Sequence, residues 1–168
     1  MKKLILILSL ILSQSTMAAN FQEKNKTVID AIIKAADRAE IPRELLLTIC
    51  YIESSFRTKG VTHIDGGTLS HSICQVKLAT AKFMDKVYSH KYKATYDRLE
   101  DPFINAYYAA KLLKYNLERY DDNWKLAIDA YNRGTALKEN TKYTRKFTKY
   151  LSFIKSELKE RIGYVEKR

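Results

Sequence analysis

The sequence contains few of the residues that build metal centres or disulfide frameworks. Its 168 residues include two cysteines, three histidines, two prolines and one tryptophan. Cys50 and Cys74 form neither a CxxC pair nor a Cys/His cluster, and the histidines show no metal-ligand spacing. We therefore expect no metal and no cofactor. The two cysteines are either bridged, as an oxidising compartment would favour, or buried as apolar thiols.

The sequence also lacks an apolar run long enough to cross a bilayer, which takes about 20 residues. Its apolar stretch over residues 4–12 follows Met-Lys-Lys and precedes small and polar residues that end at Ala19. This is the layout of a cleavable secretory signal. We expect a signal peptide over residues 1–19, cleaved after Ala18 or Ala19. The protein would then be periplasmic or secreted, with no membrane attachment after cleavage.

Acidic residues are outnumbered in the remaining chain. Removing residues 1–19 takes away two lysines and no acidic residue, so the formal net charge falls from +11 to +9. Residues 20–168 suffice for a single domain and show no repeat, linker or low-complexity segment. A basic exported domain suggests an anionic partner, which is nucleic acid, anionic lipid or the acidic cell-wall polymer. Charge alone does not choose among them.

Hydrophobic periodicity predicts an all-α fold. We expect helices over residues 27–39, 42–54, 78–87, 102–117 and 124–131 and from residue 141 onward, with a polar connector over 90–100. Asp121–Asn123 reads as a turn that caps the following helix, and Gly134 as a left-handed cap. Residues 57–71 hold three of the five glycines and have no periodicity. We expect a functional loop there, with room for a small irregular β element.

Glu53 stands at the end of a strongly apolar helix that contains Leu45–Ile52. A carboxyl group partly withdrawn from water favours its protonated form, so such a glutamate can act as a general acid near neutral pH. The alternative is an ordinary helix-end glutamate that points into solvent.

Six short motifs support the catalytic interpretation of Glu53. In chain order they are Pro42-x-Glu-Leu-Leu, Glu53-Ser-Ser-Phe, Ser72-Ile-Cys-Gln75, Thr80-Ala81, Asp101-Pro-x-x-Asn105 and Ala130-Tyr-Asn-x-Gly134. Over residues 28–150 this order resembles the soluble lytic transglycosylase domain, a module shared with goose-type lysozymes. The resemblance implies a small lysozyme-like helical fold with a cleft for the glycan strand of peptidoglycan.

The resemblance also assigns roles to individual residues. It implies that Glu53 is the indispensable catalytic acid, that Gln75 lines the cleft and that the Tyr131 hydroxyl lies close to Glu53. The expected substrate-binding residues are Ser54, Ser70, Gln75, Tyr131 and Asn132.

The chain departs from the family pattern at two positions. Ser72 stands where the family usually has glycine, and Cys74 where it has methionine. Cys50 lies three residues before Glu53 and faces much the same side of the helix. A Cys50–Cys74 bridge would therefore pin the helix that carries Glu53 to residues 72–75, the cleft segment.

Three functional hypotheses follow. The first is a lytic transglycosylase that cleaves the β-1,4 bond between N-acetylmuramic acid and N-acetylglucosamine, with the muramic acid's own 6-hydroxyl closing onto C1. The second is a hydrolase in which Asp65 activates water, which needs two carboxylates about 6.5–9.5 Å apart; Asp65 is otherwise a turn residue. The third is a non-catalytic cationic module that binds the cell wall or nucleic acid. We favour the first, as a monomer whose partner is the peptidoglycan glycan strand and not nucleic acid.

Overall fold

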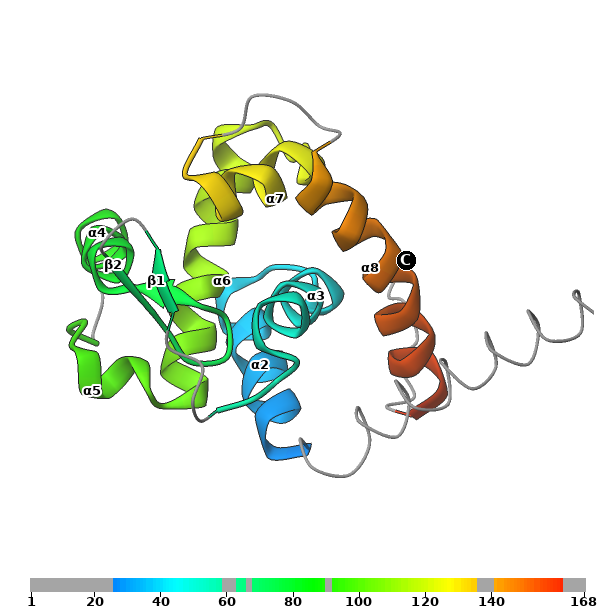
Figure 1. The fold of residues 1–168 in the computed structure, drawn as a ribbon, viewed down its shortest axis with the longest axis horizontal. Coiled ribbons are helices and arrows are strands. Elements are labelled where there is room, and N and C mark those ends of the chain that lie inside the picture. Colours follow the sequence, from blue (N-terminus) through cyan, green and yellow to red (C-terminus); the bar gives the residue numbers. More distant parts are fainter. Residues whose placement is uncertain (1–25, 59–62, 66–67, 90–91, 136–140, 162–168) are drawn as a thin grey trace, which may run out of the picture.

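The computed structural model describes residues 26–58, 63–65, 68–89, 92–135 and 141–161. Within them the fold is mainly α-helical with one small antiparallel sheet (Figure 1), which confirms the predicted fold class. The helices are α2 (Lys26–Ala39), α3 (Arg43–Ser54), α4 (Leu78–Tyr88), α5 (Tyr96–Leu99), α6 (Pro102–Arg119), α7 (Trp124–Arg133) and α8 (Lys142–Arg161). The predicted signal peptide, residues 1–19, lies outside the described residues.

Helix α3 is the central element of the fold. Residues 45–50 are all buried, because α3 packs against α2, α6 and α8 (Figure 1). Helix α2 buries one face, which consists of Val28, Ile29, Ile32, Ala35, Ala36 and Ala39. It packs on α6, where Ala106, Ala109 and Ala110 are fully buried. Alanines on both helices allow a close approach, so a compact helix pair supports α3.

The helix boundaries follow the capping residues. Asp101 accepts a hydrogen bond from the Ile104 N–H at 2.8 Å and starts α6. Asn123 accepts from the N–H groups of residues 125 and 126 and starts α7, which ends at Gly134 with a left-handed φ of 81°. The two side chains bond N–H groups that would otherwise be unpaired at the helix N-termini, and the glycine ends α7, as the sequence predicted.

The sheet occupies part of the glycine-containing loop. Strand β1 (His63–Asp65) pairs antiparallel with β2 (Thr68–His71), which pairs with β3 (Val76–Lys77). The small β element is therefore confirmed, and β3 extends it beyond residue 71. The polar connector predicted over residues 90–100 is wrong in part, because it contains helix α5, which buries Leu99 completely.

None of the helices in the described ranges combines the length and the apolar character needed to cross a membrane.

Candidate active site

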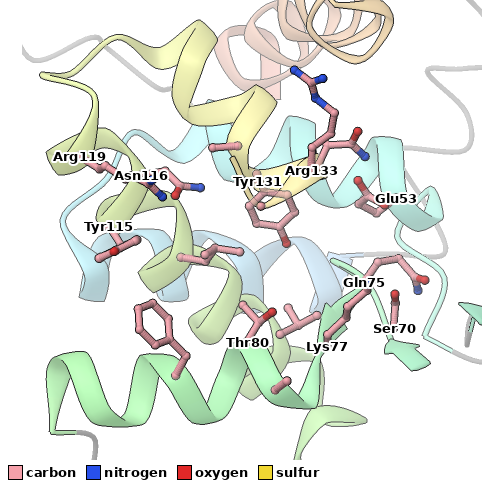
Figure 2. A pocket seen from close by; sticks show the side chains of 17 residues that line it. Glu53, Ser70, Gln75, Lys77, Thr80, Tyr115, Asn116, Arg119, Tyr131 and Arg133 are labelled. Atoms are coloured by element: carbon pink, nitrogen blue, oxygen red, sulfur yellow. The ribbon is translucent and has the colours of Figure 1, made fainter. Parts of the chain in front are cut away.

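Glu53 lies in the last turn of α3, on the wall of a cleft of about 950 Å³ (Figure 2). The residue is half-buried, whereas residues 45–50 of α3 are buried in the core. The helix ends here because Ser55 adopts a left-handed φ of 54° and its N–H bonds the Tyr51 carbonyl at 2.8 Å. The negative end of the α3 dipole therefore lies beside the Glu53 carboxyl.

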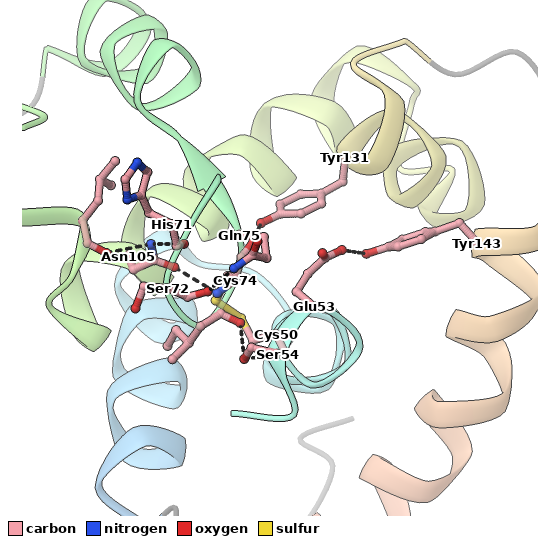
Figure 3. The surroundings of a disulfide bond; sticks show 12 residues. Cys50, Glu53, Ser54, His71, Ser72, Cys74, Gln75, Asn105, Tyr131 and Tyr143 are labelled. Atoms are coloured by element: carbon pink, nitrogen blue, oxygen red, sulfur yellow. Dashed lines mark hydrogen bonds between the residues drawn. A yellow bond between two sulfur atoms is a disulfide. The ribbon is translucent and has the colours of Figure 1, made fainter. Parts of the chain in front are cut away.

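The Glu53 carboxyl is held by Tyr143, which lies in the first turn of α8 and outside the described cleft lining. The Tyr143 hydroxyl donates to Glu53 Oε1 at 2.5 Å (Figure 3). Burial, followed by the charge of Glu53 and this hydrogen bond, raises the pKa of the Tyr143 hydroxyl well above its usual value. The hydroxyl therefore stays a neutral donor and fixes the orientation of the carboxyl group.

The cleft segment, residues 72–75, contributes Gln75 to the cleft lining and has an unusual backbone. Ser72 and Gln75 have φ angles of 57° and 52°, in the left-handed region that favours glycine. A glycine, which the family usually has at the position of Ser72, adopts such a φ without strain, whereas this chain has a serine there. Non-glycine residues in this region carry backbone strain, which persists where surrounding contacts enforce it.

Asn105 of α6 supplies some of those contacts. Its Oδ1 accepts from the Cys74 N–H at 3.0 Å, and its Nδ2 donates to the carbonyls of His71 and Leu99, both at 2.9 Å. The side chain is completely buried. One asparagine therefore holds Cys74 within the cleft segment and His71 immediately before it (Figure 3).

Cys50 and Cys74 form a disulfide with a Cα–Cα distance of 4.2 Å. This settles the open alternative between a bridge and free thiols, and the bond links α3 to the cleft segment (Figure 3). With a sequence separation of 24, a bridge of this loop length stabilises the fold by about 3.5 kcal/mol in the chain-entropy model.

Tyr131 of α7 lines the cleft and contacts the cleft segment. Its hydroxyl donates to the Cys74 carbonyl at 2.7 Å. Burial, and then the charge of Glu53, raises the pKa of this hydroxyl well above its usual value. The charge of Glu53 thus acts on the Tyr131 hydroxyl, in line with the proximity that the resemblance implied, and Tyr143 donates a hydrogen bond to the carboxyl.

The remaining cleft lining is neutral or cationic. Within the described part of that lining, Glu53 is the single carboxylate, and the cations are Lys77, Arg119 and Arg133. Arg133 pairs with Asp129, which lies one turn earlier in α7 and is fully buried. Among the described residues, no group of three or more histidine, cysteine or acidic side chains is placed to hold a metal ion.

The residues that line this cleft all lie within the range that a known protein family matches. The model of the transglycosylase SLT domain matches residues 30–153. The chain belongs to this family. Membership in the SLT family indicates a transglycosylase-type activity on peptidoglycan, a polymer that lies outside the cytoplasm.

The chain also resembles two bacterial proteins, each named protein IpgF, from Shigella flexneri and Shigella sonnei. Each is 30% identical over 131 residues, which cover 76% of this chain and 82% of the relative. No solved structure matches the chain significantly.

The structure of this SLT domain brings most of the predicted site residues together. The cleft is lined by Glu53, Ser70, Gln75, Tyr131 and Asn132 (Figure 2). Ser70 lies in β2, and the Gln75 side chain donates to the Ser72 carbonyl at 2.8 Å.

Ser54 is placed differently from the prediction, whereas the role predicted for Asp65 stays a prediction. Ser54 is 2% exposed and does not line the cleft; its hydroxyl bonds the Ile73 carbonyl at 2.7 Å, so it ties α3 to the cleft segment. Asp65 pairs with Thr68 in the β1–β2 hairpin, and its side chain lies outside the described residues.

Sequence reasoning missed the role of Tyr143. The residue lies on the apolar stripe of the last helix, together with Phe147 and Ile154, and the periodicity alone indicates no more than membership of that stripe. A signal was available, because Tyr143 is the first residue of the stripe and carries a hydroxyl group that needs a partner when buried.

Proposed function

We propose that this SLT domain cleaves the β-1,4 bond between N-acetylmuramic acid and N-acetylglucosamine, with Glu53 as general acid and then general base. The observation that carries the proposal is the Glu53 carboxyl, half-buried on the cleft wall and bound by the Tyr143 hydroxyl at 2.5 Å. A volume of about 950 Å³ is at the upper end of ligand sites and suits a chain of sugars.

In the first step, protonated Glu53 donates its proton to the glycosidic oxygen as the bond to C1 breaks. A sugar alkoxide is a poor leaving group, so it needs this proton in the transition state. Positive charge develops at C1 and the ring oxygen, next to the newly formed Glu53 carboxylate. The leaving strand departs with a free hydroxyl group.

In the second step, the Glu53 carboxylate accepts the proton of the muramic acid 6-hydroxyl, and the oxygen of that hydroxyl bonds to C1. The product is a 1,6-anhydro sugar, and Glu53 is again protonated. No water is consumed, so one carboxylate is sufficient. The match of residues 30–153 to the transglycosylase SLT domain supports this route.

The surroundings suit a carboxyl group that must hold and return a proton. The negative end of α3 opposes an additional negative charge at Glu53. The Tyr143 hydroxyl, neutral because its pKa is raised, stabilises the carboxylate that forms in the first step. Ser70, Gln75 and Asn132 offer neutral donors and acceptors for the hydroxyl and N-acetyl groups of the glycan.

Replacing Glu53 by glutamine tests the proposal. On purified sacculi, we expect Glu53→Gln to release soluble muropeptides at least about a hundredfold more slowly than the unmodified protein. Glu118→Gln, which removes an exposed carboxylate outside the cleft, is the matched control and retains activity. Release by Glu53→Gln at the unmodified rate would refute the role of Glu53. Co-sedimentation with sacculi verifies that the variant still binds.

Hydrolysis with Asp65 remains the alternative, and Asp65→Asn distinguishes it. The lytic route predicts anhydro ends from this variant at an undiminished rate. Loss of activity in Asp65→Asn, together with reducing ends from the unmodified protein, would favour hydrolysis.

We further propose that residues 1–19 export the chain and are then removed, which gives a periplasmic or secreted monomer. N-terminal sequencing of the exported protein tests this and is expected to begin at Ala19 or Asn20. An N-terminus at Met1 would contradict the proposal.

A further inference from the structure

The cleft extends beyond the catalytic residues to a second end between α4 and α6. Figure 2 shows Tyr115 and Arg119 at this end, away from Glu53. Leu112, Tyr115, Asn116 and Arg119 all line the cleft, at the spacing of one helical stripe. This stripe covers about 10 Å of cleft wall, at ~1.5 Å per residue, which is longer than a single pyranose ring.

Phe83 of α4 exposes an aromatic ring in this part of the cleft. It lines the cleft and is 45% exposed, although it is a large apolar side chain. Its ring meets the Tyr115 ring edge-on, with centroids 5.4 Å apart and an interplanar angle of 88°. Tyr115 therefore holds the ring of Phe83 in a defined orientation. A flat apolar ring fixed at the wall of the cleft is suited to stack on the apolar face of a sugar.

Arg119 adds an accessible positive charge next to these rings. It lies one turn after Tyr115, is exposed and lines the cleft. Its guanidinium packs over the Tyr120 ring at 5.3 Å, and within the described residues no ion pair joins it to a carboxylate. Arg133, in contrast, is neutralised by the buried Asp129. The charge of Arg119 is therefore available to an anion in the cleft.

We propose that Phe83, Tyr115 and Arg119 form a distal subsite for a muramic acid residue that carries a peptide. The sugar ring stacks on Phe83, and Arg119 binds a carboxylate of the peptide attached to that sugar. The inference rests on the proposed function and adds a preference to it. The enzyme favours long, peptide-bearing glycan strands over short strands or strands without peptides.

Phe83→Ala tests the stacking part of the proposal, with Val87→Ala as the matched control. Val87 lies one turn later on α4, is 41% exposed and does not line the cleft. On glycan strands of increasing length, we expect Phe83→Ala to raise KM about five- to tenfold on long strands with little change in kcat. The advantage of long over short strands should shrink accordingly, whereas Val87→Ala keeps it. An unchanged length dependence in Phe83→Ala would overturn the subsite.

Arg119→Gln tests the recognition of the peptide. The substrates are the same strands with their peptides present or removed by an amidase. We expect the ratio of kcat/KM values, peptide-bearing over stripped, to fall about three- to fivefold, as for an exposed ion pair. Arg119→Lys restores part of the ratio, and raising the salt concentration lowers it in the unmodified protein. A ratio unaffected by Arg119→Gln would overturn the role of the guanidinium.

Failure of the proposed function and failure of the distal subsite give different results. If the unmodified protein cleaves neither substrate, the proposed function itself fails. If it cleaves both, and the Phe83 and Arg119 variants retain the unmodified preferences, only the distal subsite is refuted.

Discussion

Replacing Asn105 by alanine should weaken the fold strongly for a single polar substitution, because one side chain satisfies three buried backbone groups. The lost bonds join it to Cys74, His71 and Leu99, at 2.9–3.0 Å. Each bond contributes about 1 kcal/mol, and groups left unsatisfied in the core add their desolvation penalty. We therefore expect Asn105→Ala to lower the free energy of unfolding by about 4 kcal/mol.

Asn116 offers a control on the same helix. It is 2% exposed and donates one hydrogen bond, to the Ala127 carbonyl at 3.3 Å. Asn116→Ala should therefore lower the free energy of unfolding by only about 1 kcal/mol. Urea unfolding of both variants, with the disulfide intact, measures the difference. If the two variants lose the same stability, the role assigned to Asn105 in holding the cleft segment is wrong.

Three further predictions concern the residues around Glu53. Tyr143→Phe removes the hydroxyl bound to Glu53, and we expect kcat on sacculi to fall about ten- to hundredfold; an unchanged kcat would contradict its positioning role. Ser72→Gly should raise the free energy of unfolding by about 1 kcal/mol, because Ser72 has a φ of 57° and a buried hydroxyl without a partner among the described residues; a loss of stability in urea would oppose this. The raised pKa values of Tyr131 and Tyr143 keep both hydroxyls protonated in the folded protein, whereas the unfolded chain ionises them near pH 10. Their stabilising contribution is therefore complete below about pH 10 and declines above it, by up to ~1.4 kcal/mol per pH unit for each tyrosine. Unfolding experiments at rising pH should show a shallower decline for Tyr143→Phe, and equal slopes would count against the raised pKa.

Much of the fold was predictable because its signals are local. Asp101, Asn123 and Gly134 act on backbone groups within a few residues, so their sequence positions predict the ends of α6 and α7. The burial of α3 follows from its apolar residues on nearly every side. Helix α5 escaped prediction because it has four residues and depends on the burial of Leu99 in the tertiary core.

The candidate site was predictable where it coincides with short motifs. Glu53 and Gln75 line one cleft, as the order of motifs implied. The bond from Tyr143 to Glu53 joins residues 90 positions apart and exists only because α8 packs on α3. No local pattern carries that information. Ser54 could have been placed from geometry, because adjacent helical residues point about 100° apart and Glu53 already faces the cleft.

The mass of the released muropeptides tests the central claim most directly, namely that Glu53 serves as both acid and base without a second carboxylate. Sacculi are digested in water labelled with a heavy oxygen isotope, and the soluble products are analysed by mass spectrometry. We predict products one water lighter than reducing muropeptides, with no label incorporated. Reducing ends that carry the label would contradict this claim and show that water, not the sugar's own hydroxyl, attacks C1.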